Sequence, residues 1–179
     1  MRLLEIGCGD KRLAPLDGCE WETMQIENHL ETYLDGDIVH NLEDLPLPIA
    51  DNAYDIIYMS HVLEHVSWIK TIDVLKDIRR ILKDKGTLEI IVPDLNKLIE
   101  AMQAKQMPDK WRRWNKQNYY MNWFNGRLFN YEGNWHKASF NKEHLTKCLK
   151  DAGFKDIKNM DYCRGYDHGY ISLKMKAVK

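Results

Sequence analysis

The alternation of apolar and polar positions predicts short strands in the first third of the chain. An apolar run over 2–6 ends in the Gly-Cys-Gly turn at 7–9, a pattern typical of a buried strand that enters a tight turn. Weaker strand patterns cover 21–27 and 37–42, and a clear one covers 54–59. We therefore expect four strands before the first helix.

Helical spacing of apolar residues begins directly after the fourth strand. Over 61–83, the apolar side chains recur every three or four positions, with Lys, Arg and Asp between them, which predicts an amphipathic helix. Gly86 is the expected C-cap of this helix. Two further helices are expected over 96–107 and 141–152, the second with Asn141 as its N-cap.

Three more strands complete the pattern, at 87–92, 156–163 and 171–178. The last two are joined without a helix, which favours an antiparallel pair. Helices that separate apolar strands indicate a mainly parallel sheet covered on both faces. The expected fold is thus α/β: a Rossmann-like, doubly wound, mainly parallel seven-stranded sheet with a C-terminal antiparallel hairpin, in one domain over 1–179.

The segment over 105–139 does not continue the pattern of strands and helices that builds the sheet. We interpret it as a helical, aromatic-rich insertion. Its aromatic residues between Trp111 and Trp135 alternate with basic ones. Such a segment above the carboxyl ends of the strands is suited to a substrate lid. Two alternatives stay open: the aromatics only pack the insertion onto the domain, or they stack on nucleic-acid bases.

Composition narrows the function classes. The 179 residues carry a net charge of −1, so no basic field favours a nucleic-acid partner. The 4 cysteines form no C-x-x-C pair, which favours reduced thiols in a cytoplasmic protein. The sequence shows no signal peptide and no apolar stretch that could span a membrane. It gives no indication of the oligomeric state.

The glycine turn at 7–9 brings backbone close to any ligand at the carboxyl end of the sheet. The third glycine of a dinucleotide-binding fingerprint is replaced by Arg12, and Pro15 shortens the helix that would follow. A pyrophosphate needs such a helix N-terminus, whereas a ligand without phosphate does not. A simple tight turn with no ligand is the alternative interpretation.

Several sequence blocks follow this turn in a fixed order. The most specific is Ser-His-Val-Leu-Glu-His at 60–65, directly after the strand at 54–59. Together the blocks resemble the class I S-adenosylmethionine (SAM)-dependent methyltransferases, close to small members whose glycine turn lies almost at the N-terminus. The resemblance is carried by residues 3–9, 38–42, 45–48, 51–65, 79–88, 92–94, 136–140 and 152–154.

The resemblance implies SAM as the cofactor and methyl transfer as the reaction. It implies that one set of residues meets the methionine half, the ribose and the adenine of SAM. In chain order these are Glu5, Gly7, Cys8, Gly9, Gln25, Ile26, Glu27, Asn41, Leu42, Ser60 and His61.

Two positions depart from the family pattern. An aspartate usually ends the second strand and accepts both ribose hydroxyls, but Gln25 stands there, with Glu27 two positions later. Gln25 lacks the charge, so either Glu27 takes this role or SAM binds more weakly. Asn41 replaces a second aspartate, and its amide oxygen still accepts a hydrogen bond from adenine.

The residues His61, Glu64 and His65 also fit the H-x-x-E-H spacing of a zinc hydrolase, in which two histidines one helical turn apart bind the metal. No third ligand is evident downstream, and the motif follows a buried strand beside a cofactor turn. We therefore expect no metal, and interpret Glu64 and His65 as partners in a hydrogen bond within the site wall.

An oxygen acceptor of the methyl group needs a general base, and histidine is suited to this near neutral pH. His136 is the first candidate because it ends the insertion, followed by His61 and His65. The expected acceptor is a small molecule or a sugar rather than nucleic acid. Because Gln25 weakens the cofactor site, a SAM-binding domain without transferase activity remains an alternative.

Overall fold

The structure is a computed structural model that describes residues 1–8, 18–26, 37–104, 124–126, 135–165 and 169–179. For Gln25 and Ile26 it describes the backbone alone. Gly9, Glu27 and most of the predicted insertion over 105–139 therefore lie outside the described residues.

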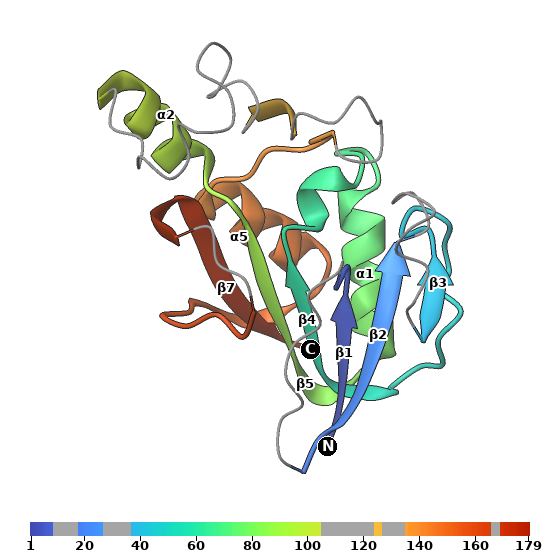
Figure 1. Cartoon of the computed structure of the whole chain (residues 1–179). Coiled ribbons are helices and arrows are strands. Elements are labelled where there is room, and N and C mark those ends of the chain that lie inside the picture. The colour runs from blue at the N-terminus through green and yellow to red at the C-terminus, as the bar shows by residue number, and fades with distance from the viewer. Residues whose placement is uncertain (9–17, 27–36, 105–123, 127–134, 166–168) are drawn as a thin grey trace.

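Seven strands form one sheet in the order β3-β2-β1-β4-β5-β7-β6. Strands β1 to β5 are parallel, whereas β7 runs antiparallel to both β5 and β6 (Figure 1). This confirms the predicted fold class and the C-terminal hairpin. The strands are β1 (Arg2–Ile6), β2 (Glu20–Ile26), β3 (Ile38–His40), β4 (Tyr54–Ser60), β5 (Leu82–Pro93), β6 (Lys155–Asn159) and β7 (Ser172–Val178).

Helices α1 (Thr71–Ile81) and α5 (Lys142–Asp151) pack against each other and cover one face of the sheet (Figure 1). Their buried side chains share one core with alternate residues of the central strands, such as Ile57 and Met59 of β4. Helix α2 (Leu95–Ala104) follows β5 and lies beyond the carboxyl end of the sheet. As predicted, Asn141 caps α5: its side chain accepts a hydrogen bond from the backbone N–H of His144.

The opposite face carries a smaller apolar cluster that includes Tyr58 and Met160. The segment over 160–165 lies on this face and is held by an ion pair. Arg164 donates two hydrogen bonds, of 2.5 and 2.7 Å, to the buried Glu89 carboxylate. Among the described residues this face is covered without a helix, so the prediction of helices on both faces is confirmed for one face only.

The predicted helix over 61–83 is wrong in its first half. A single 3-10 turn, η2 (Leu63–His65), follows β4, and Val66 is already extended, with φ −78° and ψ 137°. The α-helix begins only at Thr71. Val62, Leu63 and Val66 are buried in the main core. Their apolar spacing therefore reflects the burial of an irregular turn, not a helix face.

Gly86 does not cap a helix, because α1 ends at Ile81 and Gly86 lies inside β5. A Cβ atom at this position would lie 2.7 Å from the backbone oxygen of Lys83. A glycine is needed here because the backbone at this position lies too close to the backbone of Lys83 for any side chain. No helix among the described residues has both the length and the apolar character to cross a bilayer.

Candidate functional site

The carboxyl ends of β1 and β4 define a switch point in the sheet. From β1 the chain proceeds outward to β2 and β3 on one side, and then returns to β4 and β5 on the other. In open α/β sheets ligands bind in the crevice at such a point. Gly7 follows β1 here with φ 73°, and its N–H donates a 2.8 Å hydrogen bond to the backbone oxygen of Met24. This positive φ requires a glycine at the turn.

The structure brings several predicted cofactor residues to this edge. Glu5 lies near the end of β1, and Gly7 and Cys8 follow it. Ser60 ends the neighbouring strand β4, and His61 follows directly. The register pairs Gln25 with Val39 and Ile26 with His40, which places the end of β2 between β1 and β3. Because Gly9, Glu27 and the Gln25 side chain lie outside the described residues, the choice between Gln25 and Glu27 for the ribose stays a prediction.

Asn41 and Leu42 follow β3 at the same edge. The Asn41 side-chain oxygen accepts a 3.0 Å hydrogen bond from the Glu43 N–H, so it stabilises the turn that leaves β3. An amide oxygen has two lone pairs, and the second can still serve an adenine amine. The Leu42 side chain is buried in the core, so the predicted contact of this residue with adenine could come only from its backbone.

His61 directly follows β4 and has a left-handed conformation with φ 55°. Its N–H donates a 2.9 Å hydrogen bond to the backbone oxygen of Ile91, which holds this turn against β5. A non-glycine residue in this region is uncommon and tends to occur at functional sites. The turn reverses the chain into η2, so that His61 Nδ1 lies 3.2 Å from Oε1 of Glu64.

His136 reaches this turn from far along the chain. The backbone N–H groups of Lys137 and Ala138 both donate to the backbone oxygen of Glu64, at 2.7 and 3.1 Å. His65 Nδ1 lies 3.2 Å from the backbone oxygen of Trp135, and the rings of His65 and His136 are 5.0 Å apart. The three histidines that the sequence suggested as bases are thereby gathered around one buried carboxylate.

Glu64 is the most buried charged group at this end of the sheet, with 2% of its surface exposed. Burial alone raises the pKa of a carboxyl group. Here the hydrogen bond with His61 and the attraction of His61, His65 and His136 outweigh the burial and lower the pKa of Glu64 to about 2. The carboxylate is therefore ionised at neutral pH, and it gives the site a fixed negative charge.

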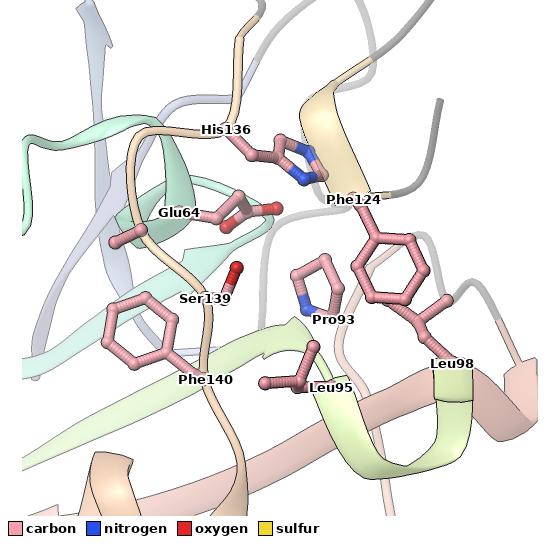
Figure 2. A pocket seen from close by; sticks show the side chains of 9 residues that line it. Glu64, Pro93, Leu95, Leu98, Phe124, His136, Ser139 and Phe140 are labelled. Atoms are coloured by element: carbon pink, nitrogen blue, oxygen red, sulfur yellow. The ribbon is translucent and has the colours of Figure 1, made fainter. Parts of the chain in front are cut away.

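A pocket lies beside Glu64 (Figure 2). Its cavity volume is about 10 Å³, the room for about one water molecule. Figure 2 shows the Glu64 carboxylate directed toward the His136 ring, with the Phe124 ring beside them. The wall is apolar except for Glu64, His136 and Ser139, and comprises Pro93, Leu95, Leu98, Phe124, Ala138 and Phe140.

Sequence analysis did not predict that these residues form one pocket wall. Two sequence blocks could have indicated it, Val-Pro-Asp at 92–94 and His-Lys-Ala-Ser-Phe at 136–140. The two blocks meet in the structure, where the Leu95 N–H donates to the backbone oxygen of Phe140 and Asp94 forms a parallel bridge with it. The zinc-hydrolase motif H-x-x-E-H requires both histidines on one helix. His61 lies in a left-handed turn outside η2, so the structure does not form that motif.

Comparison with known proteins agrees with this geometry. A family model described as a methyltransferase domain matches residues 1–159. A SAM-dependent methyltransferase from Archaeoglobus fulgidus has a similar structure, with a TM-score of 0.59 and 15% identity over 99% of this chain and 86% of that one. Human N-acetylserotonin methyltransferase, solved with SAM, gives a TM-score of 0.57 and 16% identity over 99% of this chain and 47% of that one.

A protein from Methanocaldococcus jannaschii, described as uncharacterized, is 45% identical over 56 residues. This match covers 31% of the present chain and 24% of the archaeal protein, so it spans about a quarter of that relative. The family model, in contrast, covers most of the chain, and the solved methyltransferases match its structure over 99% of its length. The chain belongs to the methyltransferase domain family and has the Rossmann-like fold of the class I SAM-dependent enzymes.

Proposed function

We propose that this protein binds SAM at the switch point between β1 and β4 and transfers its methyl group to a small-molecule or glycan-type acceptor. One observation carries the proposal. The Gly7 turn follows β1, and the Glu64–His136 pocket is built on the turn that follows β4, the strand paired with β1. A cofactor in the crevice and the acceptor atom at the mouth of the pocket would thus lie side by side. Membership of the methyltransferase family supports the same arrangement.

The cofactor set is the one that the sequence suggested. Glu5 and the backbone of Gly7, Cys8 and Gly9 hold the methionine half, together with Ser60 and His61. The end of β2, with Gln25, Ile26 and Glu27, holds the ribose, and Asn41 and Leu42 hold the adenine. The carboxyl ends of four neighbouring strands supply these residues, which supports one continuous binding crevice.

The pocket indicates the kind of acceptor. Because its cavity has room for about one water molecule, Glu64, His136 and Ser139 suit a single polar atom that receives the methyl, and the body of the acceptor would lie outside it. We propose that residues 105–139 form the lid of the single domain. Its described parts support this, since Phe124 and His136 line the pocket and the His136 N–H donates to the backbone oxygen of Asn125.

Methyl transfer is an in-line displacement at the sulfonium methyl. A lone pair on the acceptor forms the new bond to the methyl carbon, the carbon–sulfur bond breaks, and its electron pair stays on sulfur. The protein supplies alignment and a dry cavity. For a hydroxyl acceptor, His136 would take the proton, with His65 and His61 as the next candidates; the negative charge of Glu64 stabilises the imidazolium that forms.

Calorimetric titration of the purified chain with SAM and with its demethylated product tests the proposal. We expect one site that binds both ligands. Absence of heat with either ligand, in a sample whose sheet is intact by circular dichroism, would overturn the proposal.

A second experiment separates the enzyme from a SAM-binding domain without transferase activity. Purified chain and SAM with a labelled methyl group are incubated with fractionated cell extract, and the label is followed into small molecules and glycans. Transfer supports the enzyme. Binding of SAM without transfer by any fraction would favour the domain that lacks transferase activity, which is the second candidate because Gln25 replaces the usual carboxylate.

A further inference from the structure

Glu64, His65 and His136 each offer one ligand atom, and these three atoms lie within 4.8 Å of one another. The set of two imidazoles and one carboxylate is the donor set of catalytic zinc sites and of non-haem iron sites. From this geometry we propose that the three residues bind one divalent transition-metal cation, with an open coordination position toward the acceptor pocket.

The Glu64 carboxylate is arranged as such a ligand. Its Oε1 atom contacts Nδ1 of His61 at 3.2 Å. Its Oε2 atom is fully buried and has no hydrogen-bond partner among the residues that the structure describes. A buried carboxylate oxygen without a partner is costly, and each such atom calls for an explanation. A cation between Glu64 and the two imidazoles would satisfy it.

The imidazole of His65 is oriented for the same purpose. Its Nδ1 faces the backbone oxygen of Trp135, which only accepts hydrogen bonds, so this nitrogen carries the proton. In the neutral imidazole, Nε2 then holds the lone pair. Metal-binding histidines in proteins are commonly fixed in this way by an outer hydrogen bond. In the same way, the contact of His61 with Oε1 fixes the orientation of the Glu64 carboxylate.

The geometry needs only a small contraction. Ligand atoms at about 2.0–2.2 Å from a tetrahedral metal are about 3.4 Å apart. Glu64 is fully buried, whereas both imidazoles are only partly buried, so the contraction would have to come from His65 and His136. Imidazole ligands favour zinc, cobalt, nickel or iron over magnesium, which takes oxygen ligands.

The role of the open position rests on the proposed methyl transfer, whereas the binding of the metal does not. An acceptor hydroxyl that coordinates the cation loses its proton to solvent water at a lower pH. Its oxygen then forms the bond to the methyl carbon as the carbon–sulfur bond breaks and sulfur keeps the electron pair. In this arrangement His65 and His136 bind the metal, and neither serves as the base.

Titration of the untagged, metal-stripped chain with Co²⁺, followed by visible absorption, tests the site. We expect one equivalent to give ligand-field bands, Zn²⁺ to abolish them by displacement, and excess Mg²⁺ to leave them unchanged. Glu64→Gln and His136→Gln should each weaken Co²⁺ binding at least tenfold. His61→Gln, which removes an outer partner, should weaken it by roughly 10–100-fold. His144→Gln, at an exposed histidine on α5, is the matched control and should bind like the unmodified chain.

Two results would overturn the metal site: no saturable Co²⁺ binding by the unmodified chain, or binding that survives in both Glu64→Gln and His136→Gln. Circular dichroism establishes that each variant is folded, and the two variants change different elements. SAM titration of the same samples separates the proposals. Loss of the metal site with SAM binding intact leaves the proposed function standing, and the reverse result leaves the metal site standing.

Discussion

His61 Nδ1 and Glu64 Oε1 lie 3.2 Å apart, and this pair joins a strained turn to a buried charge. His61 is 12% exposed and Glu64 only 2%, so solvent does little to screen the pair. Removal of one partner from such a pair leaves the other charge buried without compensation.

We expect His61→Asn to lower the free energy of unfolding by about 3 kcal/mol at neutral pH. Asparagine tolerates the left-handed backbone, so the loss reports on the missing imidazole. The double variant His61→Asn/Glu64→Gln should lose less than the sum of the two single variants, because its buried group is neutral. Urea unfolding of all four proteins measures this, and strictly additive effects would contradict the coupling.

The Gly7 turn allows a test of the cofactor crevice with a matched control. Gly7 and Gly18 have nearly the same φ, 73° and 72°, but Gly18 precedes β2 at the opposite edge of the sheet. A Cβ at Gly18 would meet nothing within 4 Å. Each change to alanine should destabilise the fold by about 1–2 kcal/mol. Only Gly7→Ala should also weaken SAM binding, by at least tenfold in calorimetry.

Equal effects of the two substitutions on SAM affinity would place the cofactor elsewhere. Thermal unfolding of both variants without ligand provides the control for stability. A SAM-dependent rise in the melting temperature that survives in Gly18→Ala and is lost in Gly7→Ala would agree with the expected result.

The sheet was predictable because its signal is local. The strands at 2–6 and 54–59 alternate or run apolar in short stretches bounded by turns, and the structure forms β1 and β4 there. The cap at Asn141 was predictable for the same reason, since one side chain and one nearby N–H form it. The parallel pairing of β4 with β5 followed from the helix that separates them, whereas the order of the strands was not predicted.

The site was only partly predictable. The histidines could be suggested by type, but the meeting of His136 with Glu64 depends on backbone hydrogen bonds from Lys137 and Ala138, which no periodicity encodes. The apolar spacing at Val62, Leu63 and Val66 indicated a helix because burial of an irregular turn gives the same pattern. Apolar spacing indicates which residues are buried, but it does not distinguish a helix from an irregular turn.

Arg164 holds the 160–165 segment on the helix-free side of the described sheet. Its guanidinium pairs with Glu89, and the nearby Gly165 N–H donates a 3.2 Å hydrogen bond to the Tyr58 hydroxyl. We expect Arg164→Met to increase the exchange rate of the Gly165 amide hydrogen by at least tenfold while the β4 amides keep their protection. Exchange followed by NMR or mass spectrometry tests this. Lys147→Met, at an exposed ion pair on α5, is the control.

Asp77 ties α1 to the loop between β3 and β4. It accepts hydrogen bonds from Arg80 at 2.6 and 3.0 Å and from the Leu47 N–H at 2.8 Å. Burial raises the pKa of Asp77, but these hydrogen bonds and the charge of Arg80 outweigh it, so the pKa of this carboxyl is lowered from its ordinary value.

Because the pKa of Asp77 is lower in the folded state, its stabilising effect is present above the unfolded pKa of about 3.9 and is lost as pH falls through the folded value. Asp77→Asn should therefore lower the free energy of unfolding at pH 7 by about 1.5–3 kcal/mol relative to the unmodified chain. The difference should shrink below about pH 4. Urea unfolding across pH 3–7 measures it, and a difference that stays constant with pH would exclude the charge as its source.

The antiparallel pairing of β5 with β7 has a consequence for biosynthesis. Strand β5 is complete at Pro93, but the neighbour that covers its outer edge is residues 172–178. A ribosome-bound nascent chain that has formed β1 to β5 therefore presents an unpaired β-edge while about eighty further residues are translated. Sheet edges of this kind recruit other chains, so this protein should depend on chaperone protection during that interval.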